Sequence, residues 1–266
     1  MKQFLKNSEI SRLLPDFGEE GGLTKETHLV KKGNEKYVLR ICRDMETANL
    51  YEALSKKFEK YGFLPKLLKR QGKKLLYEYI PGRDLRKSDA LKLAYQVGKI
   101  AGRISETPFS GQEKIDFDER FYKELDYLIR KSIIDKQKAV HIKEKYKELR
   151  ETINPKNCLE IVDPCPDNFR LSKGKVYLVD IHAIKIDMKG RSFAKTFMKW
   201  FKTKTQRKRF EEGYNSVSSM KFLTKNYLEL VYLYHLVKNI AMKARDKRDY
   251  KTQLNKLNKI LKGDLK

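Results

Sequence analysis

A short stretch beyond the middle of the chain contains three side chains whose types suit phosphate chemistry. In IVDPCPDNFRLSKGKVYLVDIH, Asp163 is followed five residues later by Asn168, and a strand, a turn and a returning strand then lead to Asp180. A carboxylate can orient an attacking hydroxyl group, and an amide with a second carboxylate can hold magnesium on nucleotide phosphates. Because a hairpin returns its far end beside its start, Asp180 is expected near Asn168. The pattern therefore predicts a phosphoryl-transfer site.

The same residues also fit a purely structural interpretation. Asp163 and Asp167 each adjoin a proline, where aspartate often forms turns, and Asp180 could cap the end of a strand. A short motif of this kind also arises by chance. The elements around it must therefore decide between the two interpretations.

The first third of the chain is predicted to be mainly β-structure around one helix. Residues 27–30 and 36–41 are β-branched or alternating around a KGNE turn, which predicts a hairpin. Asp44 can cap a following helix, whose apolar residues recur at helical spacing until Gly62 and Pro65. Two short strands are expected next, over residues 66–70 and 74–79.

After a break at Pro81-Gly82 the chain is predicted to be mostly helical. One loop-and-hairpin insertion, between residues 159 and 186, interrupts the helices and carries the three polar side chains. We expect an α+β fold with two lobes, a small β-rich N-lobe over residues 1–79 and a larger helical C-lobe over residues 80–266. Helices are expected over residues 88–107, 117–133, 138–152, 192–201, 204–214 and 223–244.

Basic residues far outnumber acidic ones. The 266 residues include 60 Lys and Arg against 35 Asp and Glu, a formal net charge of +25. Such a field attracts phosphates, nucleic acid or an anionic membrane surface, although lysines spread over solvated faces would give the same charge. The basic residues cluster over residues 195–209 and 238–266.

Cysteine usage and hydropathy indicate the cellular setting. Cys42, Cys158 and Cys165 lack the spacing of a zinc site or a disulfide framework, which favours reduced thiols. The opening MKQFLKNSEISRLLPDF has no apolar core of signal-peptide length, and no stretch approaches a membrane-spanning run. We expect a soluble cytoplasmic protein, with an anionic membrane surface as a candidate peripheral partner.

The insertion resembles the catalytic loop and metal-binding segment of the aminoglycoside phosphotransferase and choline kinase group, within the protein-kinase-like fold. The resemblance extends from about Gly21 to Tyr214. EEGGLTKETHLVKKGNEKYVLRIC is similar to that group's glycine-bearing opening, LLYEYIPGRDL to its inter-lobe hinge and RFEEGYNS to a segment of its last helices. The resemblance implies a bilobal protein-kinase-like fold and an ATP-dependent kinase with an alcohol group as acceptor, using ATP and Mg²⁺.

The resemblance also implies roles for individual residues. Asp163 would be the catalytic base, and Asn168 and Asp180 would be the magnesium ligands. Arg40 would contact the α- and β-phosphates and pair with a helix carboxylate, for which Glu46 is the first choice and Glu52 the second. The other nucleotide contacts would come from the opening, over the phosphates, and from backbone groups of the hinge, around adenine: Gly21, Gly22 and Thr24, then Glu78, Tyr79 and Ile80.

Three positions depart from the pattern or extend it. The group's catalytic loop usually begins with His-Gly or His-Arg, whereas this chain has Ile161-Val162, an apolar pair that could brace the loop by packing. Arg40 stands where many kinases carry lysine, and the two are not interchangeable at a tight phosphate site. His182 could face the metal site or be a structural group. A nucleotide-binding protein with little turnover is therefore a further hypothesis.

Two acceptor classes remain open. A cationic acceptor, such as an aminoglycoside or choline, would need carboxylates and aromatic faces, for which the chain offers Glu211, Glu212, Glu229, Asp187, Trp200 and Tyr214. The segment VYLVDIHAIKIDMKGRSFAKTFMKWF is also similar to lipopolysaccharide-core sugar kinases, whose acceptors are anionic glycolipids. The basic residues after Asp180 would suit such an acceptor: Lys195, Lys199, Lys202, Arg207, Lys208 and Arg209.

Nucleic-acid binding is a third hypothesis, from a different class of function. It would use the basic C-terminal helices and would predict an affinity that falls steeply with salt. It ranks last, because the chain has no known base-reading motif. A small-molecule or glycolipid acceptor is thus the expected partner.

Overall fold

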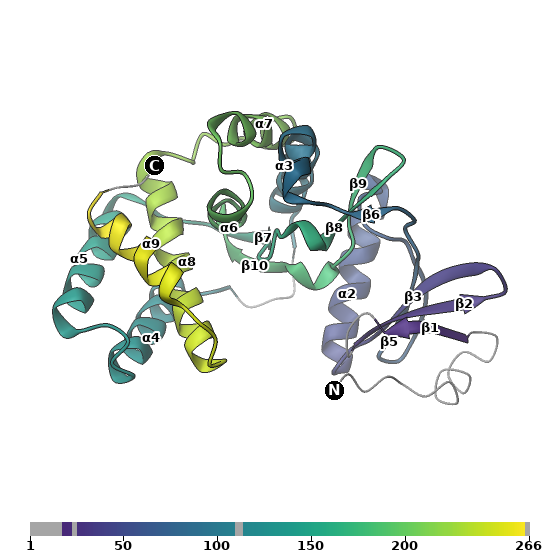
Figure 1. The fold of residues 1–266 in the computed structure, drawn as a ribbon, viewed down its shortest axis with the longest axis horizontal. Helices are drawn as coiled ribbons and strands as arrows, with labels where there is room; N and C mark the ends of the chain where they lie inside the picture. Colours follow the sequence, from purple (N-terminus) through teal and green to yellow (C-terminus); the bar gives the residue numbers. More distant parts are fainter. Residues whose placement is uncertain (1–17, 23–25, 110–113, 264–266) are drawn as a thin grey trace. The chain divides into compact units, whose positions relative to one another are not determined.

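The computed structural model describes residues 18–22, 26–109 and 114–263. The described chain forms two compact units (Figure 1). The sheet unit comprises the described residues up to Arg86 together with Pro166–His182, and the helical unit comprises Lys87–Cys165 and the described residues from Ala183 onward. The predicted domain boundary between residues 79 and 80 stays a prediction.

A five-stranded antiparallel sheet is the main element of the sheet unit, with the strand order β1-β2-β3-β5-β4. The predicted hairpin is confirmed, because β2 pairs with β3 from Thr27 opposite Arg40 to Lys32 opposite Glu35. Its turn passes through Gly33, whose φ of 59° favours glycine. The strands are β1 (Gly18–Gly22), β2 (Thr27–Lys32), β3 (Glu35–Ile41), β4 (Leu67–Gln71) and β5 (Lys74–Glu78).

Helix α2 (Met45–Phe58) packs against β4 and β5 (Figure 1). It begins as the sequence predicts, because the side chain of Asp44 accepts a hydrogen bond from the Thr47 N–H at 2.7 Å. It passes into a 3₁₀ turn, η1 (Glu59–Tyr61), and Gly62 ends that turn with a φ of 61°. The apolar face of α2 is buried at helical spacing through Ala48, Tyr51, Leu54 and Phe58.

A small three-stranded sheet completes the sheet unit. Its strands are β6 (Arg83–Asp84), β8 (Phe169–Ser172) and β9 (Lys175–Leu178), in the order β6-β8-β9. The expected hairpin around Gly174 is therefore confirmed, and β6 adds a strand that the sequence did not indicate. Gly82 permits this pairing, because a Cβ there would lie 2.1 Å from the Leu171 carbonyl oxygen.

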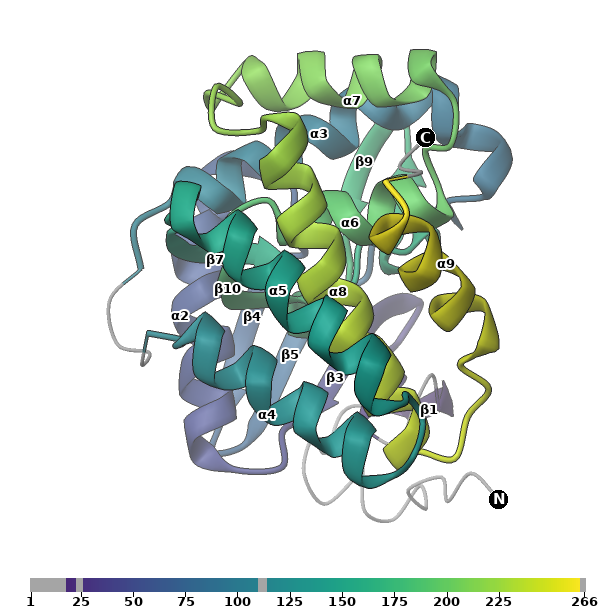
Figure 2. The same ribbon diagram turned by 90° about the vertical axis from the view of Figure 1, so that its left-hand side faces the viewer.

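The helical unit is built around α8, whose buried residues extend around most of its circumference. Helices α4, α5 and α9 pack beside α8, as Figure 2 shows, and α3 packs along α7. A two-stranded antiparallel pair, β7 (Asn157–Ile161) and β10 (Ile184–Met188), lies within the unit. The helices are α3 (Ala90–Glu106), α4 (Phe117–Arg130), α5 (Lys136–Thr152), α6 (Arg191–Lys199), α7 (Lys204–Asn215), α8 (Lys225–Arg245) and α9 (Lys251–Leu261).

Helix α9 and the β7–β10 pair are the main additions to the predicted elements. The helical pattern of α9 is hard to recognise in the sequence because lysines are frequent there. In the structure, Gln253, Leu257 and Ile260 are buried at helical spacing. Strands β7 and β10 are short and separated by more than twenty residues, so no local turn signal connects them. Three short 3₁₀ segments join these elements: η2 (Lys87–Asp89), η3 (Pro166–Asn168) and η4 (Ile181–Ala183).

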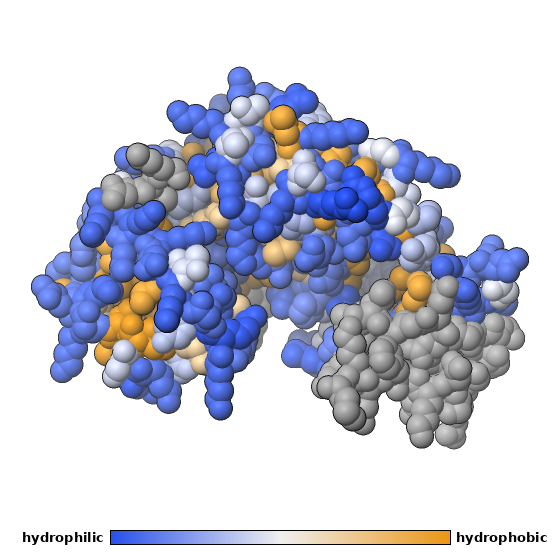
Figure 3. Space-filling model, in the orientation of Figure 1, coloured by the Kyte–Doolittle hydropathy of each residue, from blue (hydrophilic) through white to orange (hydrophobic). Residues whose placement is uncertain are grey.

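The surface reflects the charged composition. Hydrophilic side chains cover most of the described surface in the view of Figure 3, with apolar areas between them. Over the ranges that the structure describes, no helix combines the length and the apolar composition needed to cross a membrane.

Candidate active site

A cavity of about 510 Å³ lies within the sheet unit. Its apolar lining comes from β2, β3, β5 and the segment after η1, and includes Leu29, Val38 and Leu64. Its lining also includes six of the residues that the sequence predicts for the nucleotide and metal sites: Arg40, Glu78, Tyr79, Ile80, Asn168 and Asp180. An apolar pocket with a few convergent polar groups is the usual form of a small-molecule site.

Arg40 and Asp180 form an ion pair in this cavity. The Arg40 Nη1 atom donates to the Asp180 Oδ1 atom at 3.0 Å, and the Arg40 side chain is only 13% exposed. Burial alone would lower the pKa of Arg40, but the charge and the hydrogen bond of Asp180 outweigh it and raise this pKa. Asp180 is thus held close to a permanent cation.

Tyr51 of α2 connects this ion pair to His182. The Arg40 guanidinium lies 5.2 Å from the centre of the Tyr51 ring, and the Tyr51 hydroxyl group is hydrogen-bonded to the His182 Nδ1 atom. The backbone N–H of His182 donates to Asp180 Oδ1 at 3.1 Å. Burial raises the pKa of Tyr51 to about 12, so its hydroxyl group stays protonated at neutral pH. Sequence reasoning considered His182 but missed Tyr51, which looks like an ordinary apolar position of α2.

The two carboxylates proposed as partners of Arg40 have other surroundings. Glu52 forms ion pairs with Lys56, at 2.8 Å, and with Arg70. Glu46 is an exposed residue in the first turn of α2. Among the described residues the ion-pair partner of Arg40 is Asp180 rather than a carboxylate of α2, and a role for Glu46 at the nucleotide stays a prediction.

The glycine-rich opening is described in part. Gly21 and Gly22 end strand β1, opposite Leu29 and His28 of β2. The β1–β2 pairing shifts register between Glu19 and Gly21, a bulge of the kind that glycines permit. Thr24 lies outside the described residues. Contact of this segment with phosphates stays a prediction.

The predicted hinge forms the end of β5 and the residues after it. Glu78 is tied to Lys66 twice, through its backbone N–H to the Lys66 carbonyl at 3.0 Å and through its side chain to the Lys66 N–H at 2.8 Å. Arg170 of β8 lies 5.4 Å from the Tyr79 ring centre and donates to the Ile80 carbonyl at 3.1 Å. These contacts hold the hinge backbone in place, and its role in binding adenine stays a prediction.

Asn168 and Asp180 have the donor atoms that magnesium prefers. Both side chains line the same cavity and offer hard oxygen donors, and a nucleotide and water molecules would supply the other ligands of an octahedral ion. The described residues contain no cluster of three or more His, Cys, Asp or Glu side chains that could hold a metal alone. The two residues therefore fit a magnesium ion bound jointly with phosphate oxygens.

Asp163 belongs to the helical unit, just after strand β7. Ile161 ends β7, is fully paired with Ile184 of β10 and is buried. The next residue, Val162, donates its N–H to the Ala183 carbonyl at 2.8 Å. This strand pairing supplies the brace that was expected from packing of the Ile161-Val162 pair.

The carboxylate of Asp163 forms an ion pair with Lys195 of α6. Burial alone would raise the pKa of Asp163, but a hydrogen bond from Cys165 and the Lys195 contact outweigh it and lower this pKa. Asp163 therefore stays ionised below the usual range for aspartate. The side chain is 48% exposed, so a ligand can reach it.

Helix α6 is anchored by Glu160, which sequence reasoning missed. Glu160 is 1% exposed and accepts hydrogen bonds from the N–H groups of Gly190, at 2.8 Å, and Ser192, at 3.0 Å. These donors belong to the first turn of α6, where a carboxylate also complements the helix dipole. Glu160 thus fixes the start of the helix that carries Lys195.

The residues proposed for a cationic acceptor lie mostly in the core of the helical unit or in ion pairs. Trp200 and Tyr214 are buried aromatic core residues, and Asp187 is buried against Lys238 at 3.2 Å and Arg191 at 3.7 Å. Glu229 is buried and lies 3.5 Å from Lys145. Glu212 pairs with Arg209 at 3.8 Å, and Glu211 beside it is partly buried.

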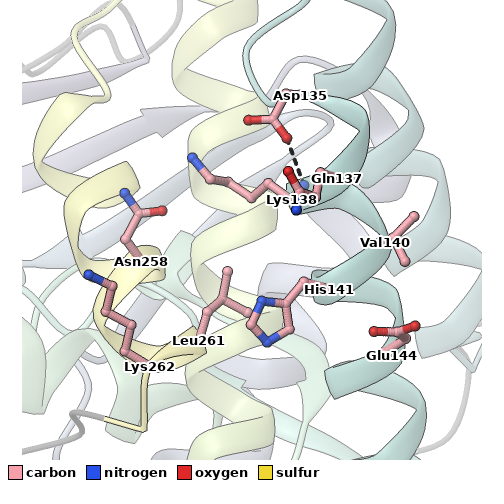
Figure 4. A pocket seen from close by; sticks show the side chains of 9 residues that line it. All are labelled: Asp135, Gln137, Lys138, Val140, His141, Glu144, Asn258, Leu261 and Lys262. Atoms are coloured by element: carbon pink, nitrogen blue, oxygen red, sulfur yellow. Dashed lines mark hydrogen bonds between the residues drawn. The ribbon is translucent and has the colours of Figure 1, made fainter.

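A second cavity, of about 810 Å³, lies between α5 and the end of α9 (Figure 4). It is lined by polar side chains such as Asp135, His141 and Lys262, with Val140 and Leu261 among them. Asp135 is the N-cap of α5 and accepts from the Lys138 N–H at 2.7 Å, so its carboxylate has a structural role. Among the described residues that line this cavity, none is a predicted site residue.

Comparison of the structure with solved structures decides the fold. Choline kinase LicA from Streptococcus pneumoniae superposes with a TM-score of 0.67 at 16% sequence identity, covering 97% of this chain and 96% of that chain. The AMP-bound complex of spectinomycin phosphotransferase APH(9)-Ia superposes with a TM-score of 0.69 at 12% sequence identity, covering 97% of this chain and 98% of that chain. The chain has the protein-kinase-like fold of these proteins. The resemblance predicted from sequence is confirmed at the level of the fold.

A further structure shows the same likeness. A choline/ethanolamine kinase family protein from Mesorhizobium loti superposes with a TM-score of 0.66 at 11% identity, covering 93% of this chain and 87% of that chain. The sequence matches no protein-family model and no curated protein. The α+β fold with a small sheet lobe and a helical lobe is therefore a finding of structure, not of sequence similarity.

Proposed function

We propose that the protein is an ATP-dependent phosphotransferase that moves the γ-phosphate to a hydroxyl group of a small molecule. The observation that carries this proposal is the cavity of the sheet unit, where Arg40, Asn168 and Asp180 converge on one apolar pocket. Structures with the same fold are complexes with AMP or with ADP and spectinomycin, which supports a nucleotide as the ligand. Choline, ethanolamine and spectinomycin, the substrates in the names of these proteins, all carry hydroxyl groups.

Each residue would act through the chemistry of its side chain. Arg40 would bind the nucleotide phosphates, since its planar guanidinium can donate two parallel hydrogen bonds. Asp163 would accept a hydrogen bond from the acceptor hydroxyl and orient its oxygen towards the γ-phosphate. The lowered pKa of Asp163 keeps it in the accepting form throughout the neutral range.

Asn168 and Asp180 would hold Mg²⁺, which neutralises the phosphate charge when bound. The Arg40–Asp180 ion pair is compatible with this, because the phosphates would compete with Asp180 for the Arg40 donors. Asp180 would then turn its charge towards the ion. Glu78, Tyr79 and Ile80 would border the adenine ring, with Gly21, Gly22 and Thr24 near the phosphates.

A nucleotide-binding protein without turnover is the second candidate. The ion pair between Arg40 and Asp180 favours it, because a carboxylate that stays bound to a guanidinium would coordinate magnesium poorly. This candidate predicts that ATP binds without magnesium and is not consumed. If the protein instead bound nucleic acid, substitutions of residues that line the cavity would leave that binding unchanged.

The test is thermal stabilisation by ATP with and without magnesium, followed by release of ADP in the presence of acceptors. Wild type should show a magnesium-dependent shift that Asp180→Ala loses. Asp163→Ala should keep that shift and abolish phosphate transfer, because its side chain would contact the acceptor rather than the nucleotide. Full transfer activity in either variant would refute the site assignment, and a magnesium-independent shift would favour the second candidate.

A further inference from the structure

If the protein carries out the proposed phosphotransfer, the charges around Asp163 determine which class of acceptor can bind there. An acceptor hydroxyl that reaches Asp163 must bring the rest of its molecule close to the surrounding side chains. In the helical unit these side chains come from α6, α8 and α9. Their charge therefore selects the class of acceptor.

Two lysines of α6 act on Asp163, and lysines of α8 and α9 lie near them. Lys195 and Lys199 are one turn apart on α6 and so share a face, and Lys195 contacts Asp163 directly. Lys256 of α9 donates to the Met198 carbonyl in the last turn of α6 at 3.1 Å, which brings a third cation against the same helix. Lys243 of α8 is held nearby by neutral acceptors, the Asp249 carbonyl at 2.7 Å and Gln253 Oε1 at 3.1 Å.

These cations are close enough to repel one another. Burial and then the charge of Lys195 lower the pKa of Lys199, and Lys243 lowers it further. Burial and then the charges of Lys199 and Lys202 lower the pKa of Lys256. Cys165 and Asp163 act in the opposite direction on the pKa of Lys199 but do not outweigh these effects. A bound anion would relieve the repulsion.

Three of the carboxylates proposed for a cationic acceptor are held in ion pairs elsewhere in the helical unit. Asp187 and Glu229 are buried in ion pairs, and Glu212 pairs with Arg209 on α7. Trp200 and Tyr214, the candidate aromatic faces, are at most 3% exposed. A quaternary or polyamine cation beside Asp163 would therefore be repelled by the described lysines of α6.

We propose that the acceptor is an alcohol that also carries a phosphate or carboxylate group, and that Lys199 and Lys256 bind this group beside the Asp163–Lys195 pair. The proposal rests on the proposed function and adds the substrate class. The anionic group could belong to a free metabolite or to a lipid headgroup, since both present the same oxygens to the lysines. Lys199 is exposed and Lys256 partly exposed, so both can reach a ligand.

The first experiment measures ADP release with matched acceptors. Glucose 6-phosphate and glucose differ by one phosphate, while choline and kanamycin represent cationic alcohols. Vesicles of phosphatidylglycerol and of phosphatidylcholine distinguish a headgroup from a free anion, because only the phosphatidylglycerol headgroup offers hydroxyl groups on an anionic lipid. We expect turnover with an anionic acceptor and none with choline or kanamycin; turnover of the cationic alcohols alone would overturn the proposal while leaving the proposed function intact.

The second experiment measures binding, so it does not depend on choosing the right acceptor. Calorimetric titration of inorganic phosphate, with saturating ADP and magnesium in the nucleotide site, should give a dissociation constant that rises at least about ten-fold in Lys199→Gln/Lys256→Gln. The single variant Lys199→Gln changes an exposed side chain and should show a smaller rise in a normally folded protein. Lys204→Gln on α7 and Lys259→Gln on α9 are the matched controls, since both are exposed and neither is among the main causes of the lowered pKa of Lys199 or Lys256.

The outcomes are distinct. Equal phosphate affinity in wild type and the double variant would overturn the proposal. Equal weakening in the controls would also overturn it, because the effect would then be one of total charge. If magnesium and ATP do not raise the melting temperature of wild type, the proposed function is contradicted. Phosphate binding by the lysines does not depend on that result.

Discussion

Replacing Gly98 with alanine tests how closely α3 and α7 must approach. An alanine Cβ at this position would lie 2.0 Å from the Phe210 carbonyl oxygen, whereas real Cβ atoms essentially never come within 3.0 Å, so the helices would have to separate by about 1 Å. A Cβ at Gly213 on α7 would likewise lie 1.9 Å from the Tyr95 carbonyl oxygen of α3. The contact is between backbones, so no side chain can rotate away from it.

The expected change in the free energy of unfolding of Gly98→Ala follows from two opposing contributions. Alanine gains about 1 kcal/mol of helix propensity over glycine. Overpacking of a buried site costs about 1–3 kcal/mol, and a backbone contact belongs at the upper end. The net expectation is a loss of about 2 kcal/mol in the free energy of unfolding. Because Phe210 packs on Phe193 and Phe197 of α6, at ring distances of 5.3 and 5.6 Å, the strain should also reach the helix that carries Lys195.

The chain contains a single tryptophan, which makes the measurement specific to this unit. Trp200 follows α6 in the helical unit and is buried, so its fluorescence should report the unfolding of that unit in urea. We expect Gly98→Ala to lower the midpoint with an unchanged slope, and Lys99→Ala, an exposed neighbour on α3, to have little effect. A Gly98→Ala protein as stable as wild type, or more stable, would refute the reasoning, since propensity alone would then govern the site.

Three further predictions concern buried or paired side chains. The hydrogen bond from Arg150 lowers the pKa of Asp118, so the ionised Asp118 stabilises the folded state above the usual pKa of 3.8, and this stabilisation is lost as pH falls through the lowered pKa. Asp118→Asn should therefore lower the free energy of unfolding at pH 7, and in urea titrations its difference from wild type should narrow as the pH falls below 3.8. Burial lowers the pKa of Lys238 to about 8, so the folded state binds fewer protons than the unfolded chain between pH 8 and 10.5. The free energy of unfolding of wild type, relative to that of Lys238→Met, should therefore rise with pH over that range. A difference between the two proteins that does not change with pH would contradict the prediction. Tyr51→Phe keeps the ring beneath Arg40 but removes the hydrogen bond to His182, so calorimetry should show a free energy of unfolding that is lower by about 1 kcal/mol. An unchanged free energy of unfolding would contradict the presence of that hydrogen bond.

Local signals in the sequence predicted much of the fold. The KGNE turn, the Asp44 cap and the glycine that ends η1 act over a few residues, and the structure has each of them in the expected place. The short strands of the small sheets were harder to predict. Arg83 and Asp84 form β6 because β8, more than eighty residues away, offers them an edge, and no periodicity of two residues can signal this.

The candidate site divides in a similar way. Residue types and spacing identified Asn168 and Asp180, and the resemblance added Arg40; all three line one cavity. The partner of Arg40 could not be chosen by spacing, because Glu46, Glu52 and Asp180 are all carboxylates that the fold could bring near. On α2 it is the ring of Tyr51 that lies against the Arg40 guanidinium.

By itself the sequence determined the residue types of a phosphate site, the division into β-rich and helical parts, and the basic character of the chain, because these depend on composition and on neighbours along the chain. Only the tertiary structure decided which charges meet. It put Lys195 on Asp163, anchored α6 through the buried Glu160, and buried Asp187 and Glu229 in ion pairs. Charge pairing depends on distances of a few ångströms between distant segments, and burial sets its strength, so neither can be read from residue order.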